Sequence, residues 1–418
     1  MRGTIRAASL LACALASSAK AAEPSPASDL TIEKAVATAL EKNLELKAAA
    51  AEVEAARGRG TSAAILLPNP QVEVEAGPRR RPDGTKITDV QLALSQPIPI
   101  AGQRGARVSA ADAGLRAAQA RFALRRIEVA AEVRIAFARA TAGEQRLKLA
   151  NDADHLAQEA LRAAEERLRA GAASQIEVNT ARGQRGRAAR DLIIARQEHA
   201  ASLGVLRLLL SAPSRTPLAL QTASLGTAPA ALVPADADPD ALVSKAAATH
   251  PAIGAARADL DLARAEGTLA GRQVVPDLEL GVVAGRDDEA KLLRGRLSVA
   301  LPLFDRRQGE RQIAAARVVQ AERALESAER RLEQDLRVAL VRRQAAAEAV
   351  EAYAGGVVEA LTQNLSMAGE AYMAGKIDFL ELLLIRRESL EARRAYIDTL
   401  EELQTADAAL RNAMGAAP

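Results

Sequence analysis

The chain has 418 residues, of which 49% are apolar but only 2% aromatic. Alanine must therefore supply much of the packing that large rings supply in most globular cores. Its 56 basic and 53 acidic side chains leave a net charge of only +3, which argues against a dedicated nucleic-acid surface.

Residues 1–22 are predicted to be a secretory signal peptide. The first six residues contain two arginines, residues 7–16 are mostly apolar, and small residues continue to Ala22. This order of a basic, an apolar and a small-residue region is typical of exported proteins. We expect cleavage near residues 19–22.

Cys13 allows an alternative in which residues 10–13 form a lipoprotein box and Cys13 becomes lipidated. Only about six apolar residues would then precede the cleavage site, fewer than a signal core usually has. Ordinary cleavage is therefore favoured. It leaves a mature chain without cysteine, so its fold must rest on packing without disulfides.

The next 188 or so residues predict one helix, a strand pair and two further helices. A long proline-free helical pattern lies between the strands and a glycine turn at Gly171. The predicted elements are a helix at 32–64, strands at 68–77 and 90–99, a helix at 105–170 and a returning helix at 176–210.

Residues 211–240 carry prolines at 213, 217, 229, 234 and 239. This spacing interrupts helices and predicts an irregular connector. A disordered linker is the alternative.

After the connector, the same order of elements is predicted again. The predicted elements are a helix at 242–273, strands at 276–285 and 296–304, a helix at 309–374 and a returning helix at 379–414. Three ordered sequence pairs support the duplication. The pairs are 68–77 with 276–285, 90–99 with 296–304, and 166–171 with 370–375. The expected organisation is therefore a first repeat at 23–210, a connector at 211–240 and a second repeat at 241–418.

The two long helices are too long for a compact domain. Each spans about 66 residues, or roughly 100 Å at 1.5 Å per residue. Each returning helix covers only half that length, and the helix that precedes each strand pair has about the missing length. We therefore expect each long helix to face two short ones, with the strands at one end and the turns at Gly171 and Gly375 at the other.

No run of about 18 or more apolar residues follows the signal, so a membrane-spanning helix is not expected. Along the predicted strands, apolar residues alternate with polar ones. This alternation places polar residues such as Glu73, Gln91 and Arg296 on the face opposite the apolar residues. The predicted lipid-facing residues are Val72, Val74, Leu92, Leu94, Leu278, Leu280, Leu297 and Val299. Four strands are too few to close a barrel, so a barrel would have to be shared between subunits. A soluble β-layer below a helical domain is the alternative.

Four segments carry a family resemblance through their order and spacing. They are Lys42–Leu46, Thr249–Ile253, Leu301–Gly309 and Tyr372–Leu382. With them, the chain resembles the TolC-like outer membrane efflux proteins over both repeats. The passages 97–104 and 302–309 are most similar to the outer-membrane component of cobalt, zinc and cadmium efflux systems.

The resemblance implies a mainly α fold whose long antiparallel helical hairpins form a periplasmic α-barrel. A homotrimer would share one 12-stranded β-barrel among outer-membrane lipid. Its expected partners are a periplasmic adaptor (membrane fusion) protein and an inner-membrane resistance-nodulation-division pump. The chain would then be a passive exit duct, with heavy-metal cations as the inferred cargo and with no enzymatic activity, cofactor or nucleic-acid partner. The alternatives are a drug-efflux or type I secretion channel of the same family, and a periplasmic coiled-coil scaffold or adaptor without a pore.

The resemblance also implies an acidic constriction just after the helical turns. Glu381 lies six residues after Gly375, and Glu177 holds the equivalent position after Gly171. Carboxylates close to a symmetry axis would attract cations. The alternative is simple helix capping, because Ser174 and Asp378 each precede a glutamate by three residues. Leu384 departs from the family pattern, in which a second acid often occupies that position.

Other candidate sites are weak. The only histidines, His155, His199 and His250, are far apart, and no metal site or catalytic motif is predicted. We assign all three to helix surfaces. Residues 79–84 are predicted to be an exposed charged loop, with a lipopolysaccharide contact as the alternative.

Overall fold

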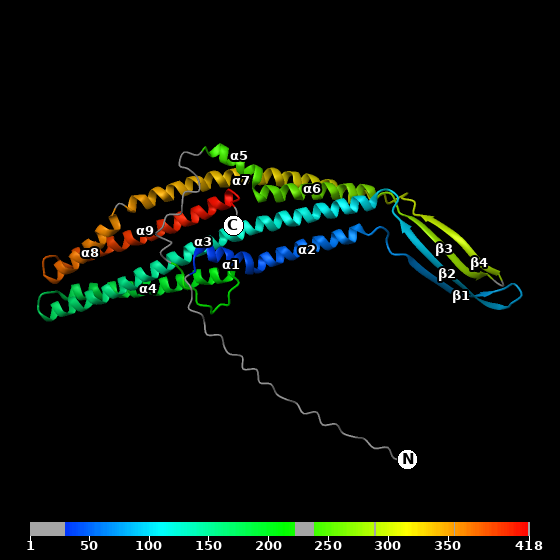
Figure 1. The fold of residues 1–418 in the computed structure, drawn as a ribbon. Coiled ribbons are helices and arrows are strands. Elements are labelled where there is room, and N and C mark those ends of the chain that lie inside the picture. Colours follow the sequence, from blue (N-terminus) through cyan, green and yellow to red (C-terminus); the bar gives the residue numbers. More distant parts are fainter. Residues whose placement is uncertain (1–29, 222–237, 288–289, 355, 417–418) are drawn as a thin grey trace, which may run out of the picture.

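The computed structural model describes residues 30–221, 238–287, 290–354 and 356–416. The predicted signal peptide, which includes Cys13, and residues 222–237 of the predicted connector lie outside these residues. The molecule is long and narrow, with a β-sheet at one end and two helical turns at the other (Figure 1). The chain's C-terminal end lies near the middle, which we call the waist.

The element order confirms a mainly helical fold with four strands. The first repeat contains α1 (Ile32–Lys42), α2 (Leu44–Ala64), β1 (Gln71–Arg80), β2 (Lys86–Ile98), α3 (Gln103–Arg169) and α4 (Gln175–Leu209). The second contains α5 (Pro239–Thr249), α6 (Pro251–Arg272), β3 (Leu278–Asp287), β4 (Ala290–Val299), α7 (Gln308–Ala354), α8 (Val357–Met373) and α9 (Phe379–Ala413).

The prediction of one unbroken helix before each strand pair is wrong. Asn43 leaves the helical conformation between α1 and α2, and its Oδ1 accepts hydrogen bonds from the backbone N–H groups of Glu45 and Leu46, at 2.9 and 3.1 Å. In the second repeat, Pro251 begins α6 directly after His250, because the residue before a proline is disfavoured in helix. Both breaks lie at the waist.

The two long helices differ. α3 is continuous over 67 residues, as predicted. The predicted helix at 309–374 is instead divided into α7 and α8, and Gly356, with φ of 86°, precedes α8 in a left-handed conformation. The sequence has two adjacent glycines there, and glycine weakens a helix interior by about 1 kcal/mol relative to alanine. This cost explains why the interruption falls at that position.

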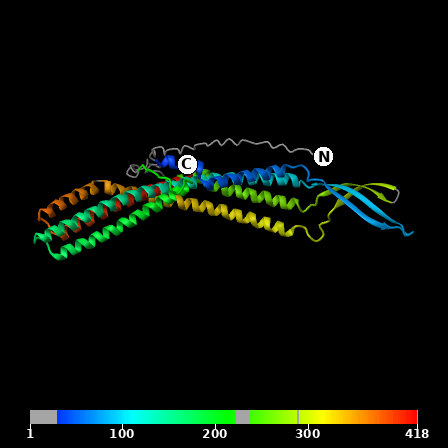
Figure 2. The same cartoon turned by 90° about the horizontal axis from the view of Figure 1, so that it is seen from below.

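α3 is the central helix, against which most of the other helices pack. It packs against α2 and α6 toward the sheet and against α4 and α9 toward the turns, while α7 packs against α6 and α9. Figure 2 shows these helices side by side along both halves of the rod. The arrangement confirms that each long helix faces two short ones. Most buried residues of α3 are alanines, which lets neighbouring axes approach closely.

Two apolar clusters hold the waist. In the first repeat, Phe137 and Val133 of α3 meet Leu206 of α4 and residues of α1. The described start of the connector joins this cluster, because Leu30 forms a parallel bridge with Leu220. In the second repeat, Leu336 of α7 packs with residues of α5, α6 and α9. These clusters contain the largest buried side chains of their regions.

The strands form one antiparallel sheet in the order β1-β2-β3-β4. Its register aligns Val72 with Leu94 and then Val282, and aligns Leu280 with Leu297. The eight predicted lipid-facing residues therefore lie on one face, since paired residues share a face. The predicted end of the strand at 296–304 is wrong, because β4 ends at Val299. Pro302 follows closely and lacks the N–H that a ladder requires.

The assignment of all three histidines to helix surfaces is wrong for His250, which is buried at the start of α6. Its Nδ1 accepts a hydrogen bond from Ala252 N at 3.1 Å, so Nε2 carries the proton and donates to Asn412 O at 2.8 Å. Gly415 passes directly over the ring, and a Cβ at this glycine would lie 2.9 Å from His250 Cδ2. His250 therefore fastens the end of α9 to the start of α6.

Across the described residues, none of the helices has a stretch that is both long and apolar enough to span a bilayer.

Phe137 offers a test of the waist core, because its side chain is 2% exposed. Phe137→Ala should lower the free energy of unfolding by about 3–5 kcal/mol through the cavity it leaves. Phe137→Leu, which keeps most of the volume, should cost about 1 kcal/mol. Guanidinium unfolding followed by circular dichroism measures both. Equal losses for the two variants would contradict the packing described.

Candidate functional site at the helical tips

The two helical turns at the end far from the sheet have the same geometry. Gly171 and Gly375 adopt left-handed conformations, with φ of 74° and 72°. In each turn the next residue's N–H bonds back to the helix, from Ala172 to Arg167 O at 2.8 Å and from Lys376 to Ala371 O at 2.9 Å. This pattern is the Schellman motif, which favours glycine at the left-handed position. The two predicted turns thus form equivalent tips.

Both returning helices begin with a side-chain cap. Ser174 Oγ accepts a hydrogen bond from Glu177 N at 3.2 Å, and Asp378 Oδ1 accepts one from Glu381 N at 2.7 Å. These bonds satisfy backbone N–H groups that a helix start leaves unpaired. Only the backbones of Glu177 and Glu381 take part, so both carboxylates stay available for other contacts.

The two carboxylates have different surroundings. Glu177 Oε1 accepts a hydrogen bond of 2.5 Å from the Tyr372 hydroxyl, which reaches across from the other repeat. The exposed Glu381 side chain has no hydrogen bond or ion pair with any described residue. The two tips therefore share the same backbone conformation, but their glutamate side chains have different contacts.

Tyr372 joins the two tips. Its ring is 2% exposed and packs at 5.7 Å between centroids against Phe379. The Arg167 guanidinium lies 4.6 Å from the ring centroid, and Arg167 also donates to Tyr372 O at 2.9 Å. Alanine and valine residues of α3 and α4 complete the cluster. Cation–π and hydrogen-bond contacts thus tie the end of α3 to the end of α8.

The pKa of Tyr372 follows from these contacts. Burial and the hydrogen bond to Glu177 raise the pKa of Tyr372 to about 12, while the nearby Arg167 charge opposes the increase. Burial and the adjacent carboxylate both disfavour the phenolate. The tip contact should therefore be complete below pH 10 and weaken as the pH rises through 12.

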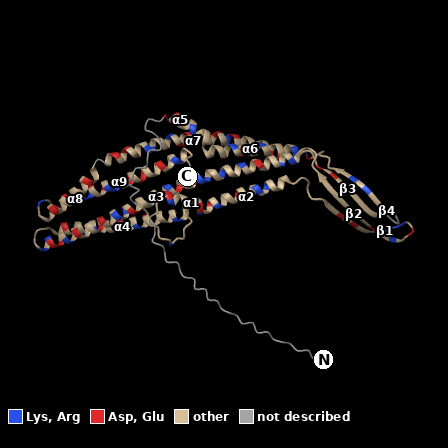
Figure 3. Ribbon diagram, in the orientation of Figure 1, with Lys and Arg blue, Asp and Glu red and all other residues tan. Residues whose placement is uncertain are grey.

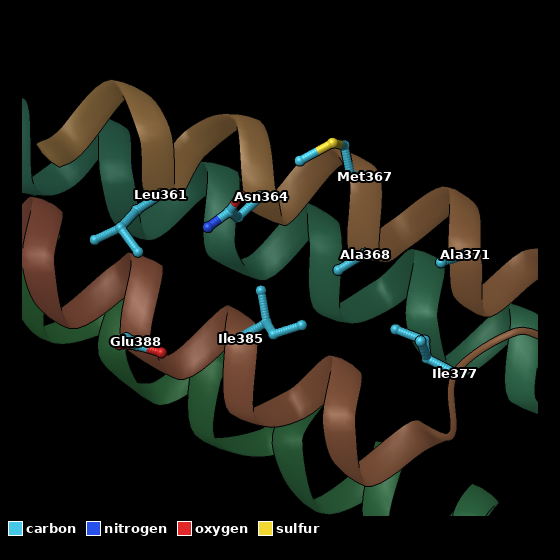
Figure 4. A pocket seen from close by; sticks show the side chains of 8 residues that line it. All are labelled: Leu361, Asn364, Met367, Ala368, Ala371, Ile377, Ile385 and Glu388. Atoms are coloured by element: carbon cyan, nitrogen blue, oxygen red, sulfur yellow. The ribbon is translucent and has the colours of Figure 1, made fainter. Parts of the chain in front are cut away.

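A narrow crevice of about 300 Å³ lies behind the second tip, between α8 and α9. Ala368 and Ala371 of α8 face Ile377 and Ile385 across it, as Figure 4 shows. Small residues on α8 leave this space open. The crevice is largely apolar and open to solvent, and Asn364 and Glu388 are the polar residues among those that line it.

Acidic and basic residues alternate along the helices in Figure 3. Within the described ranges, no three His, Cys, Asp or Glu side chains gather as a metal site. His155 Nδ1 lies 3.6 Å from Glu159 Oε1 on the exposed face of α3, and this is a single pair.

The structure brings together Gly171, Ser174 and Glu177 of one tip with Gly375, Asp378 and Glu381 of the other. The eight predicted strand residues lie at the opposite end of the molecule. Sequence analysis missed the roles of Tyr372 and Arg167. A signal was present, because Tyr372 is one of only three tyrosines and replaces Leu168 of the first repeat.

Comparison with known proteins agrees with this architecture. The sequence matches the family described as outer membrane efflux protein over residues 35–212 and 242–416. It is 28% identical over 399 residues to the cobalt-zinc-cadmium resistance protein CzcC of Cupriavidus metallidurans, covering 93% of this chain and 91% of that protein. It is 31% identical over 243 residues to the nickel-cobalt-cadmium resistance protein NccC of Alcaligenes xylosoxydans xylosoxydans, covering 56% and 52% of the two chains.

Among solved structures, CusC, reported in a study of transmembrane channel formation, shares the fold with a TM-score of 0.75. The alignment covers 93% of both chains at 19% identity. The duplicated helical hairpins, the four-stranded sheet and the matched segments define one class, the outer membrane efflux proteins. The chain belongs to this family, which confirms the resemblance seen in the sequence and agrees with the expectation that it is not an enzyme.

The raised pKa of Tyr372 can be tested by ultraviolet titration, because the chain has three tyrosines and no tryptophan. The phenolate absorbance should include one late step, near pH 12, with the amplitude of a single tyrosine. Tyr372→Phe should remove the late step, while the control Tyr396→Phe should keep it. A late step that persists in Tyr372→Phe would show that this hydroxyl is not held as described.

Proposed function

We propose that the chain is the outer-membrane exit duct of a tripartite efflux system and that it works as a homotrimer. The observation that carries this proposal is that the four-stranded sheet is open at both sides and exposes apolar residues on one face. Its exposed apolar face and its two unpaired edges cannot be stable in one isolated copy in lipid.

The edge strands fit a closed ring. β1 and β4 run antiparallel in the four-stranded sheet, so β4 of one copy can continue the alternation beside β1 of the next. Three copies with four strands each give twelve, an even number within the range of bacterial outer-membrane barrels. The apolar face would then meet lipid, since Val72 and Val74 are each 65% exposed and Leu297 is 69% exposed.

The helices extend the ring as a tunnel away from the membrane. In the half near the tips, α4 lies at one side of α3 and α9 at the other, followed by α8. Away from the contact between Tyr372 and Glu177 at the tips, α4 and α8 are thus the outer helices, and each can meet the next copy. α4 carries more arginine than acid, while the charged residues of α8 are Glu359 and Glu370 alone. This complementarity supports contact between α4 and α8 of adjacent copies.

The cargo we propose is a heavy-metal cation. The matched relatives are named as resistance proteins for cobalt, zinc, cadmium and nickel. A periplasmic adaptor and an inner-membrane resistance-nodulation-division pump would deliver the cation, because a passive duct supplies no energy. The chain itself needs no metal site for this role.

The tips are the proposed gate. Tyr372, Glu177 and Arg167 hold the two hairpins of one copy together, and Glu381 leaves a free carboxylate beside them. Three Glu381 carboxylates near one axis would favour cations over anions. Release of the Tyr372 contact would let α8 and α9 move outward together.

Metal tolerance tests the proposed function. Bacteria that keep the cognate pump and adaptor but lack this chain should lose tolerance to cobalt, zinc and cadmium, and the chain should restore it. A strain that keeps metal tolerance but becomes sensitive to drugs would contradict the proposed cargo and favour a drug-efflux channel.

Conductance of the reconstituted protein tests the gate. Glu381→Ala should reduce cation preference, and Tyr372→Phe should increase conductance because the link between the hairpins is lost. Glu351→Ala, an exposed acid on α7, is the matched control and should change neither. If Glu381→Ala leaves closure and cation preference unchanged, the carboxylate has no gating role and Asp378 capping explains its position.

A further inference from the structure

On the apolar face of the sheet, a group of basic residues occupies the strand ends that lie farthest from the helices. Counting outward along β2, the residues on this face are Ile98, Gln96, Leu94, Leu92, Val90, Thr88 and Lys86. Val90 is paired with Ala76 on one side and with Arg286 on the other, and Arg286 is paired with Lys291. Lys86 is paired with Arg80. We call Arg80, Lys86, Arg286 and Lys291 the basic rim.

The rim contains two cross-strand pairs of like charge. Arg80 lies opposite Lys86 at the end of the first hairpin, and Arg286 lies opposite Lys291 at the end of the second. Like charges placed directly opposite each other destabilise a sheet. Anions bound between the cations would relieve this repulsion.

The rest of the described protein does not supply those anions. All four side chains are exposed, and none forms an ion pair with a described residue. The described acids of the sheet lie on the other face, where Arg79 pairs with Asp89 at 2.9 Å and Arg296 pairs with Glu73 at 3.7 Å. The rim therefore combines exposed cations that have no ion-pair partner among the described side chains with an adjoining apolar face.

The height of the rim fits the boundary of a membrane. Eight residues separate Ile98 from Val90, about 27 Å along a strand at 3.4 Å per residue, or about 21 Å in height at a tilt near 40°. Twelve residues separate Ile98 from Lys86, which gives about 31 Å in height by the same estimate. The apolar band of an outer-membrane barrel is about 25 Å tall, so its outer boundary falls within the rim.

We propose that the basic rim binds the phosphate groups of the phosphorylated glycolipid, lipid A, in the outer leaflet. This inference rests on the proposed function, because it requires the sheet to be inserted with its far edge outward. Arginine and lysine would donate charge-assisted hydrogen bonds to phosphate oxygens, while the acyl chains would cover the valine and leucine rows below. The rim would thereby fix the depth of the barrel.

The test uses the full reconstituted trimer in phosphatidylcholine nanodiscs, with lipid A as the probe and native mass spectrometry as the measurement of binding. The rim variant is Arg80→Gln, Lys86→Gln, Arg286→Gln and Lys291→Gln together. The matched control, with the same loss of charge, is Arg57→Gln, Arg323→Gln, Arg330→Gln and Arg387→Gln, all exposed on helices.

Bisphosphorylated lipid A should bind the rim variant at least about tenfold more weakly than the unaltered protein, since several charge-assisted hydrogen bonds are lost. The helix control should bind as the unaltered protein does, and millimolar inorganic phosphate should not compete. Binding within twofold in the rim variant would overturn the proposal. Full competition by inorganic phosphate would also overturn it, because it would indicate a free-anion site.

Failure of the proposed function would look different. A protein that does not enter nanodiscs or conduct ions in a bilayer is not an outer-membrane duct. A protein that inserts and conducts but binds lipid A equally with and without the rim is a duct whose rim has no lipid role.

Discussion

The hydrogen-bonding groups along the outer edges of β1 and β4 impose the constraint on which the rest of the structure depends. Each repeat contributes only two strands, so a single copy leaves both edges open and one apolar face uncovered. Lipid offers no hydrogen bonds to such edges. In the proposed trimer, neighbouring copies complete the sheet, and the helices that continue from its strands form a ring of the same symmetry. The outer sides of α4 and α8 would then meet in that ring.

The tips hold the two hairpins of one copy together, and in the proposed gate this contact must not close the conduit permanently. The contact combines polar groups around Tyr372 with an apolar cluster of residues from α3, α4, α8 and α9. The hydrogen bond from Tyr372 to Glu177 contributes about 1 kcal/mol net. The interruption before α8 at Gly356 and the crevice beside α8 both lie in the half of the molecule near the tips, whereas α3 of the first hairpin is continuous.

Periodicity and internal repetition were sufficient to predict the long helices, the strand faces and the turns at Gly171 and Gly375, because these depend on local residue order. They were not sufficient where tertiary contacts decide. The breaks at Asn43 and Gly356 are marked by single residues within otherwise helical patterns. Burial of His250 depends on Gly415, far away in the chain, and the Tyr372–Glu177 contact joins residues of different repeats. Capping by Ser174 and Asp378 could be predicted from spacing alone, while the unequal surroundings of Glu177 and Glu381 could not.

Disulfide cross-linking between the edge strands tests the central claim most directly. In a Cys13→Ser background, Glu75→Cys on β1 is combined in turn with a cysteine at Leu292, Arg294 or Arg296 on β4, all on the same face of the sheet. If β1 of one copy pairs with β4 of the next, oxidation of protein in outer-membrane extracts should give covalent dimers and trimers, and no larger species, in at least one combination. Monomers alone in every combination, from protein that is folded, would contradict a barrel shared among three copies.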